Sequence, residues 1–265
     1  MVKIEKYKYV DENGTVWDGG VEAERLVKIH GDKQYLNKYG VSNVSRERWN
    51  TAQSYERSEW MERGTFLSDD RNLFHKEVFD GYDSLTDVDA KSFIELGCGP
   101  FTNARVILEK FPNIEQITLL DPLANDYLNH ANCTYKKSRL NVGRSEIDVN
   151  LIASSIEDSN IKDTFDVVVM INVLEHCFDI PKIFDVVDEI LNKDGIFIYA
   201  DVQFDIETIQ KITEFKYNAG HPIRLTEEYI GNILDTKYTQ LFSKTSYEEV
   251  AGMDAEERYF IGRKR

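Results

Sequence analysis

Two glycines one residue apart, Gly97 and Gly99, directly follow a short apolar segment, and this feature constrains the fold more than any other. The segment 92–96 is apolar enough to form a buried strand, and the apolar residues of 104–108 recur as they do on a helix. A glycine turn between a strand and a helix lets a ligand approach bare backbone, because glycine adopts positive φ freely and has no side chain. The sequence therefore predicts an α/β fold with a ligand site at this turn.

The acid beside the turn, Glu95, narrows the choice of ligand. Its carboxylate would repel a pyrophosphate and attract a ligand that carries positive charge. A second acid, Asp121, ends the apolar segment 116–120, where an acid in a doubly wound sheet accepts hydrogen bonds from both ribose hydroxyls. S-adenosylmethionine combines a ribose with a sulfonium and an ammonium group. The residues therefore favour a methyltransferase.

The ordered motifs resemble the class I S-adenosylmethionine-dependent methyltransferases that act on small molecules. The segments that carry the resemblance are Glu95–Gly99 at the first motif, Asp121 at the ribose acid, Ala153–Glu157 at the adenine turn, Phe165–His176 at the fourth strand and its exit loop, and Leu191–Ile198 at the turn into the fifth strand. The resemblance implies a Rossmann-like, doubly wound α/β sheet of seven strands with an antiparallel last strand, preceded by an N-terminal extension.

The resemblance also implies which residues hold the cofactor. They are Gln53, Glu95, Gly97, Cys98, Gly99, Phe101, Asp121, Pro122, Ser155, Ile156 and Asn172. Two positions depart from the family pattern. Phe101 follows Pro100 where many relatives have a third glycine, and we expect its ring over or beneath the ligand. Ser155 replaces the usual Asp, and we expect it to hydrogen-bond the adenine amino group.

The five histidines differ in sequence context. In this family the residue after the fourth strand, here His176, lies at the methyl end of the cofactor, and His221 lies in the segment after the fifth strand. A hydroxyl acceptor must lose a proton, and histidine is the best-suited base near neutral pH. We predict that His176 or His221 is this base; the alternative for His176 is a structural ring bound to a backbone carbonyl. The other three, His30, His75 and His130, are expected on the surface.

Three further residues are expected to contact the substrate: Glu175, Tyr217 and Asn218. The segment 202–225 leaves the carboxyl edge of the sheet, where ligands bind in open α/β folds, so it is predicted to form a wall of the substrate site. The alternative, which is compatible with this role, is a structural segment with its own small helix at 206–215. Glu175 and Asp201 could each ligate magnesium, but no group of neighbouring acids has metal-ligand spacing. The sequence therefore predicts a metal-independent reaction.

Strands and helices are expected to alternate through the second part of the chain. We divide the sequence into an N-terminal arm, 1–46, and a methyltransferase domain, 47–265, whose lead-in helices occupy 47–90. Strands are expected at 92–96, 116–120, 149–153, 166–171 and 196–201, helices at 103–110, 123–129, 181–191 and 226–234, and a closing antiparallel pair at 239–244 and 258–262. In the arm, Asn13-Gly14 predicts a hairpin. The arm either covers the active site or pairs with a second copy in a homodimer.

The first helix of the domain has one distinctive face. Ser45 is a good N-cap, and Trp49, Gln53, Glu56 and Trp60 recur at helical spacing. This face either packs on the sheet or covers the cofactor. The pattern also resembles the lead-in helix of bacterial surface-glycan and capsule methyltransferases. That resemblance implies a sugar, a nucleotide sugar or a phosphorylated amino alcohol as the acceptor, methylated on oxygen or nitrogen.

Composition restricts partners and location. The formal net charge of −15 disfavours nucleic acid and anionic membranes, because both are bound through clustered Lys and Arg. Three cysteines without metal-ligand spacing predict reduced thiols, and no segment is apolar for long enough to span a bilayer. We expect a cytoplasmic protein with a small-molecule substrate.

Two other functions stay open. One is a regulatory protein that binds S-adenosylmethionine without turnover. The other is an NAD-dependent oxidoreductase, which would share the glycine turn and Asp121. Glu95 argues against the oxidoreductase, and so does Thr102, which stands where its motif has a third glycine.

Overall fold

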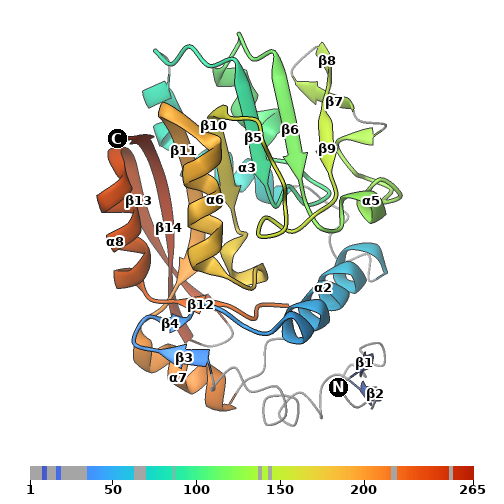
Figure 1. Ribbon diagram of the computed structural model, residues 1–265, viewed down its shortest axis with the longest axis vertical. Helices are drawn as coiled ribbons and strands as arrows, with labels where there is room; N and C mark the ends of the chain where they lie inside the picture. Colours follow the sequence, from blue (N-terminus) through green and yellow to red (C-terminus); the bar gives the residue numbers. More distant parts are fainter. Residues whose placement is uncertain are drawn as a thin grey trace.

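A seven-stranded sheet forms the centre of the molecule (Figure 1), in the order β13-β14-β11-β10-β5-β6-β9. The computed structural model describes residues 8–10, 16–18, 35–62, 70–85, 87–136, 139–142, 145–215, 220–250 and 253–265. The strands are β5 (Ser92–Leu96), β6 (Gln116–Leu120), β9 (Asn150–Ile152), β10 (Phe165–Ile171), β11 (Leu191–Gln203), β13 (Tyr238–Val250) and β14 (Met253–Lys264). The last strand, β14, is antiparallel to both its neighbours, and the five strands from β9 to β11 are parallel. The predicted fold class is confirmed.

Helices cover both faces of the sheet. The described helices are α2 (Arg46–Met61), α3 (Asp70–Val78), α4 (Ala104–Ile107), α5 (Ala124–Tyr127), α6 (Ile180–Ile190), α7 (Ile206–Phe215) and α8 (Glu227–Lys237), with 3₁₀ turns at Asp80–Leu85, Leu108–Lys110 and Leu174–His176. In Figure 1, α6 and α8 lie on one face and α3 on the other. This two-sided cover agrees with the continuous apolar character of the central strands.

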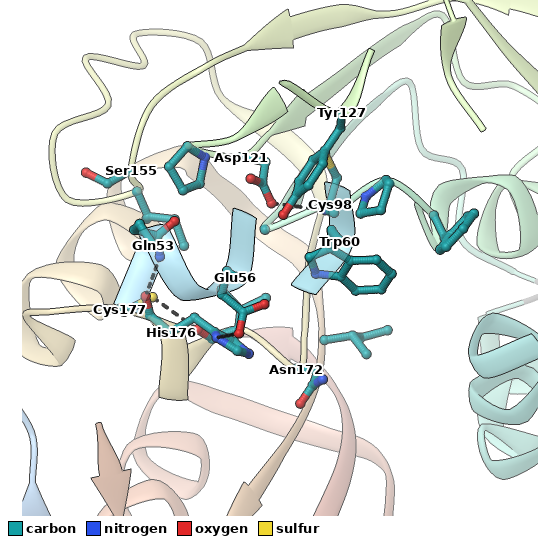
Figure 2. A pocket seen from close by; sticks show the side chains of 18 of the residues that line it. Gln53, Glu56, Trp60, Cys98, Asp121, Tyr127, Ser155, Asn172, His176 and Cys177 are labelled. Atoms are coloured by element: carbon teal, nitrogen blue, oxygen red, sulfur yellow. Dashed lines mark hydrogen bonds and ion pairs between the residues drawn. The ribbon is translucent and has the colours of Figure 1, made fainter. Parts of the chain in front are cut away.

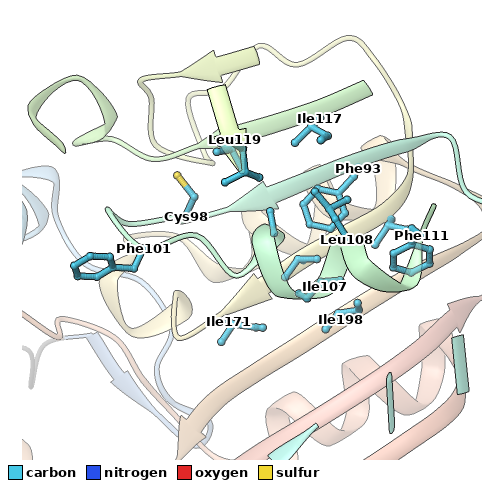
Figure 3. Close-up of a cluster of buried hydrophobic side chains, with 14 of the residues drawn as sticks. Phe93, Cys98, Phe101, Ile107, Leu108, Phe111, Ile117, Leu119, Ile171 and Ile198 are labelled. Atoms are coloured by element: carbon cyan, nitrogen blue, oxygen red, sulfur yellow. The ribbon is translucent and has the colours of Figure 1, made fainter. Parts of the chain in front are cut away.

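The core has two halves because successive strand residues point to opposite faces. Phe93 packs on the α4 side of the sheet, with Ile107 and Ile198 (Figure 3). Its neighbour Ile94 packs on the other side, with Ile183 of α6. All five side chains have 0% of their surface exposed. The sheet is therefore packed on both faces, and the loops at its carboxyl edge follow directly from buried strands.

Several predicted boundaries match the structure. Strands β5 and β6 and helix α7 begin and end at the predicted residues. The hairpin around Asn13-Gly14 is confirmed at its two strands, since β1 (Lys8–Val10) pairs antiparallel with β2 (Val16–Asp18). Strand β11 begins at Leu191 and not near 196, because Leu191 pairs with Phe165 before the ladder resumes at Ile196.

Two small sheets were not predicted. One is the hairpin of β7 (Arg139–Val142) with β8 (Ser145–Asp148). The other joins β3 (Leu36–Asn37) and β4 (Gly40–Val41) to β12 (Arg224–Leu225). Gly40 has φ +96, and a side chain there would collide with the Arg224 carbonyl. The end of the N-terminal arm is thus fixed to the segment that follows α7. Within the described residues, no helix combines the length and apolar character needed to cross a membrane.

Candidate active site

A cavity of about 880 Å³, including its mouth, lies between α2 and the carboxyl ends of the parallel strands (Figure 2). Ten of the eleven residues predicted to hold the cofactor line it, namely Gln53, Gly97, Cys98, Gly99, Phe101, Asp121, Pro122, Ser155, Ile156 and Asn172. Position alone makes this cavity the candidate site, because ligands in such sheets bind beyond the carboxyl ends of the strands.

Helix α2 forms one wall of the cavity. The Ser45 hydroxyl accepts a hydrogen bond from the Arg48 amide at 3.1 Å, which confirms the predicted cap. Trp49, Gln53, Glu56 and Trp60 all line the cavity. Trp49 Nε1 and Gln53 Nε2 also donate to the His176 carbonyl, at 3.0 and 3.2 Å. The face predicted from spacing therefore both fixes the helix to the loop after β10 and faces the cavity.

The glycine turn adopts the backbone that the sequence predicts. Gly97 and Gly99 have φ values of +72 and +53. The amides of Gly97 and Cys98 donate to the Leu120 carbonyl, which ties the turn to β6. The Tyr135 hydroxyl donates to the Gly99 carbonyl at 2.7 Å. A side chain at Gly97 would collide with Val173, so this position requires glycine.

Glu95 is the one predicted cofactor residue that does not line the cavity, so its contact with the ligand stays a prediction. The carboxylate is 1% exposed and accepts hydrogen bonds from the Asn103 amide at 2.9 Å and the Ala104 amide at 3.0 Å. The Asn103 side-chain amide and the Thr102 hydroxyl also donate to it. Burial raises the pKa of Glu95 to about 6, although these bonds oppose the shift. Glu95 therefore stabilises the start of α4 and, through it, the glycine turn.

Asp121 lies where a ribose acid should lie. Its Oδ2 accepts from the Gly99 amide at 3.0 Å and its Oδ1 from the Leu123 amide at 2.8 Å. Burial raises the pKa of Asp121 to about 6, against the effect of these two bonds. Each carboxylate oxygen has a second lone pair, so the group can accept further hydrogen bonds from a ligand in the cavity.

The turn after β9, which contains Ser155 and Ile156, forms another wall of the cavity. The Ser155 hydroxyl donates to the Asp158 carboxylate at 3.1 Å and accepts from the Asp158 amide at 3.2 Å. The hydroxyl thus shapes the turn, and Ile156, which is 3% exposed, supplies an apolar surface beside it. At the other end Phe101 packs edge-on against Trp60, with ring centroids 5.7 Å apart.

The loop after β10 is held by hydrogen bonds to the Asp201 side chain. Asn172 has φ +59 at a cavity-lining position, a strained conformation that is typical of functional sites. The Asp201 carboxylate accepts from the Val173 and Leu174 amides at 3.0 and 2.7 Å. Asp201, which the sequence left open as a metal ligand, is therefore occupied in ordering this loop. The loop presents His176 to the cavity.

Four titratable side chains, here termed the acceptor cluster, meet beside this loop: Glu56, Glu175, His176 and His221. His176 Nδ1 lies 3.4 Å from Glu56 Oε1, and His221 Nε2 lies 3.4 Å from Glu175 Oε1. The two imidazole centroids are 4.6 Å apart. Glu56 and His176 line the cavity, whereas Glu175 and His221 are not among its lining residues.

The charges of the acceptor cluster depend on one another. Burial disfavours a charge on His176, but the carboxylates of Glu56 and Glu175 outweigh it and raise its pKa. Burial lowers the pKa of His221, and His176 lowers it further. Burial raises the pKa of Glu175 well above its usual range. His176 therefore takes up a proton more readily than His221.

Comparison with known proteins identifies the domain. A family model described as "Methyltransferase domain" matches residues 94–197, which run from β5 into β11 and include the glycine turn, Asp121 and His176. No curated protein matches the chain. The strand order, the cavity and this segment agree with the resemblance drawn from the motifs. Residues 94–197 therefore match a methyltransferase domain.

Solved methyltransferase structures share this fold. The N-methyltransferase NodS from Bradyrhizobium japonicum WM9, in complex with S-adenosylhomocysteine, aligns with a TM-score of 0.56 and 20% identity over 81% of this chain and 98% of its own. The Burkholderia thailandensis 1,6-didemethyltoxoflavin-N1-methyltransferase aligns with a TM-score of 0.51 and 15% identity over 81% and 88% of the two chains. The plantazolicin methyltransferase BpumL aligns with a TM-score of 0.51 and 16% identity over 82% and 95%. At these identities the similarity is one of fold.

Two histidines of the methyltransferase domain were wrongly predicted to lie on the surface. His75 on α3 is 7% exposed and lines the cavity, and its ring lies 6.1 Å from that of Tyr259. His130 is 5% exposed and packs edge-on against Phe101 at 5.4 Å. Each ring packs against an aromatic side chain that is distant in sequence, and a local sequence pattern cannot predict such a contact. Three other predicted positions, His30, Tyr217 and Asn218, lie outside the described residues.

Proposed function

We propose that the protein transfers the methyl group of S-adenosylmethionine to an oxygen or nitrogen of a small molecule. One observation carries the proposal: a single cavity joins the glycine turn and Asp121 at one side to Glu56 and His176 at the other. The first pair of features suits a nucleoside with a charged tail, and the second suits an acceptor that must give up a proton.

The donor would lie along the carboxyl edge of the sheet. Asp121 would accept hydrogen bonds from the ribose hydroxyls, and Ile156 and Pro122 would pack on the adenine. Gln53 and Asn172 line the cavity at the side of the acceptor cluster, where the methionine end of the cofactor would lie. This placement directs the sulfonium methyl toward His176.

The acceptor would enter from the side of the acceptor cluster. Methyl transfer requires the nucleophile, the methyl carbon and the sulfur in line, and a hydroxyl must also lose its proton. Glu56, Glu175, His176 and His221 are the groups that would receive it. Tyr217 and Asn218, which precede His221 in the chain, remain proposed substrate contacts from the sequence alone.

The acceptor that we favour is a sugar, a nucleotide sugar or a phosphorylated amino alcohol of surface-glycan synthesis. The pattern on α2 supports this class by resemblance. The net charge of −15 disfavours a nucleic-acid substrate. Cys98, Cys133 and Cys177 are free, buried thiols, as expected for a cytoplasmic protein, and a homodimer through the N-terminal arm is part of the same proposal.

A mass-spectrometric screen tests this function. Purified protein and S-adenosylmethionine are incubated with pools of nucleotide sugars, phosphorylated amino alcohols and free amines. The proposal predicts a product that is heavier by one methyl group, with an equal amount of S-adenosylhomocysteine, and loss of both with the His176→Ala variant. Cofactor binding without turnover on any pool would favour the regulatory alternative.

A further inference from the structure

Two imidazoles and a carboxylate of the acceptor cluster come from three separate segments of the chain. Glu56 lies on α2, His176 ends the turn after β10, and His221 precedes β12. One donor atom of each lies within 4.8 Å of the other two. Figure 2 shows Glu56 and His176 next to each other at one side of the cavity. Sequence separation hides this group, which is why no metal-ligand spacing was visible.

The donor set is one that divalent transition metals bind. Two His and one Glu are the protein ligands of catalytic sites that keep further coordination positions open for water or substrate. Ligand atoms about 2.1 Å from one ion lie roughly 3 to 4 Å apart, so side-chain movements of about 1 Å close the set. Glu56 is 16% exposed, His176 20% and His221 31%, so an ion and its water can reach all three.

The surroundings hold these ligands in place. The Gly220 carbonyl lies 3.1 Å from His176 Nδ1 and can only accept, which places the ring proton on Nδ1. Glu56 Oε1 lies 3.4 Å from the same nitrogen, so Nε2 is the donor atom and the Glu56 carboxylate must turn toward it to share an ion. A backbone carbonyl on the second ring nitrogen is typical of metal-bound histidine. The main chain of His176 is fixed by Trp49 and Gln53, from the same helix that supplies Glu56.

We propose that Glu56, His176 and His221 bind a divalent transition-metal ion whose open positions take the acceptor hydroxyl. The inference rests on the proposed function and deepens it, since it selects an oxygen acceptor. A hydroxyl bound to such an ion loses its proton more readily. The proton leaves through the mouth of the cavity, which is open to water.

In the transfer step the O–H bond of the acceptor breaks and its proton passes to water at the mouth of the cavity. The oxygen forms a bond to the methyl carbon while the S–CH₃ bond breaks, and S-adenosylhomocysteine keeps the electron pair of that bond. In this arrangement His176 and His221 are metal ligands, and neither is the base that the sequence predicts.

Cobalt titration of the full-length protein tests the site. Protein freed of metal by a chelator is titrated with Co²⁺ and followed by its visible d–d absorption. We expect one equivalent of Co²⁺ to bind and excess Zn²⁺ to remove the absorption. Glu56→Gln and His221→Gln should each weaken Co²⁺ binding by about tenfold or more. His130→Gln and Glu62→Gln, which change a buried histidine and an exposed acid at the end of α2, should leave it unchanged.

The outcomes separate this inference from the proposed function. Absence of Co²⁺ binding to the wild-type protein overturns the metal site, and so does full binding by both cluster variants. Circular dichroism checks that the variants are folded. Calorimetry with S-adenosylhomocysteine on the same samples reports on the donor site alone. Protein that binds S-adenosylhomocysteine but no cobalt keeps the proposed function without the metal. Protein that binds cobalt but no S-adenosylhomocysteine keeps the metal and loses the function.

Discussion

Asp121 connects the glycine turn to the proposed ribose site, and its charge should control cofactor affinity. Ribose hydroxyls donate to the ionised carboxylate, so binding favours the charged form and lowers the pKa from about 6. Affinity for S-adenosylhomocysteine should therefore be highest above pH 6 and fall by up to about tenfold per pH unit below it. Calorimetry from pH 5 to pH 8 measures this. Asp121→Asn should bind more weakly at every pH and lose this dependence; a flat wild-type profile would contradict the ribose assignment.

The two glycines of the turn should respond differently to alanine. A Cβ at Gly99 meets no atom within 4 Å, and since this residue lines the cavity, the methyl group would occupy ligand space. Gly99→Ala should keep most of its stability, at a cost of about 1 kcal/mol for the positive φ, and lose cofactor affinity. Gly97→Ala must displace Val173 and should lower the free energy of unfolding by about 2–4 kcal/mol. Urea denaturation and calorimetry on both variants check the contrast, which equal stabilities would contradict.

The sequence could predict which residues border the site better than what each one does. Gly97, Asp121 and Asn172 follow strands, and strand ends meet at one edge of a parallel sheet, so their convergence was predictable. The role of Glu95 was not, because the direction of its carboxylate depends on the amides of Asn103 and Ala104 folding beneath the turn. The approach of Glu56 to His176 depends on how α2 lies against the sheet, which no local pattern encodes.

Helix α2 carries four lining residues, so its stability bears directly on the site. The Ser45 hydroxyl satisfies an amide at the helix start, and Ser45→Ala should lower the free energy of unfolding by about 1 kcal/mol. Ser54→Ala is the matched control on the same helix. Its hydroxyl only donates to the Asn50 carbonyl at 2.9 Å, and alanine is the better helix former, so this change should be neutral or slightly stabilising. Urea denaturation measures both, and an equal loss in the two variants would contradict the cap.

Elements with a strong local signal were predictable, and those made by long-range pairing were not. The apolar segments that became β5 and β6 and the periodic segment that became α7 have the predicted bounds. Strands β4 and β12 have two residues each and exist because Val41 pairs with Arg224 across the chain. Such short strands have no period to detect. They nevertheless position Gly220 and His221 next to the loop after β10, where His176 Nδ1 meets the Gly220 carbonyl.

For the whole molecule, the alternation of elements predicted an α/β fold with its site at the carboxyl edge of the sheet, and the family resemblance implied the seven strands with an antiparallel last strand. The acidic composition disfavours nucleic acid and anionic membranes as partners, but it could not select an acceptor, because net charge does not determine the shape of a site. The folded chain adds that one cavity contains both the glycine turn with Asp121 and two residues of the acceptor cluster, Glu56 and His176. The central claim is that one molecule of S-adenosylmethionine fills this cavity.

The most direct test of that claim is calorimetric titration of the wild-type protein and the Asp121→Ala variant with S-adenosylhomocysteine and, separately, with NAD. We predict that the wild-type protein binds one equivalent of S-adenosylhomocysteine per chain and no NAD. The variant should lose at least about 1.5 kcal/mol of binding free energy, as expected for hydrogen bonds to a charged group. Binding of NAD in its place, or equal affinity of the variant for S-adenosylhomocysteine, would contradict the assignment of this cavity to the methyl donor.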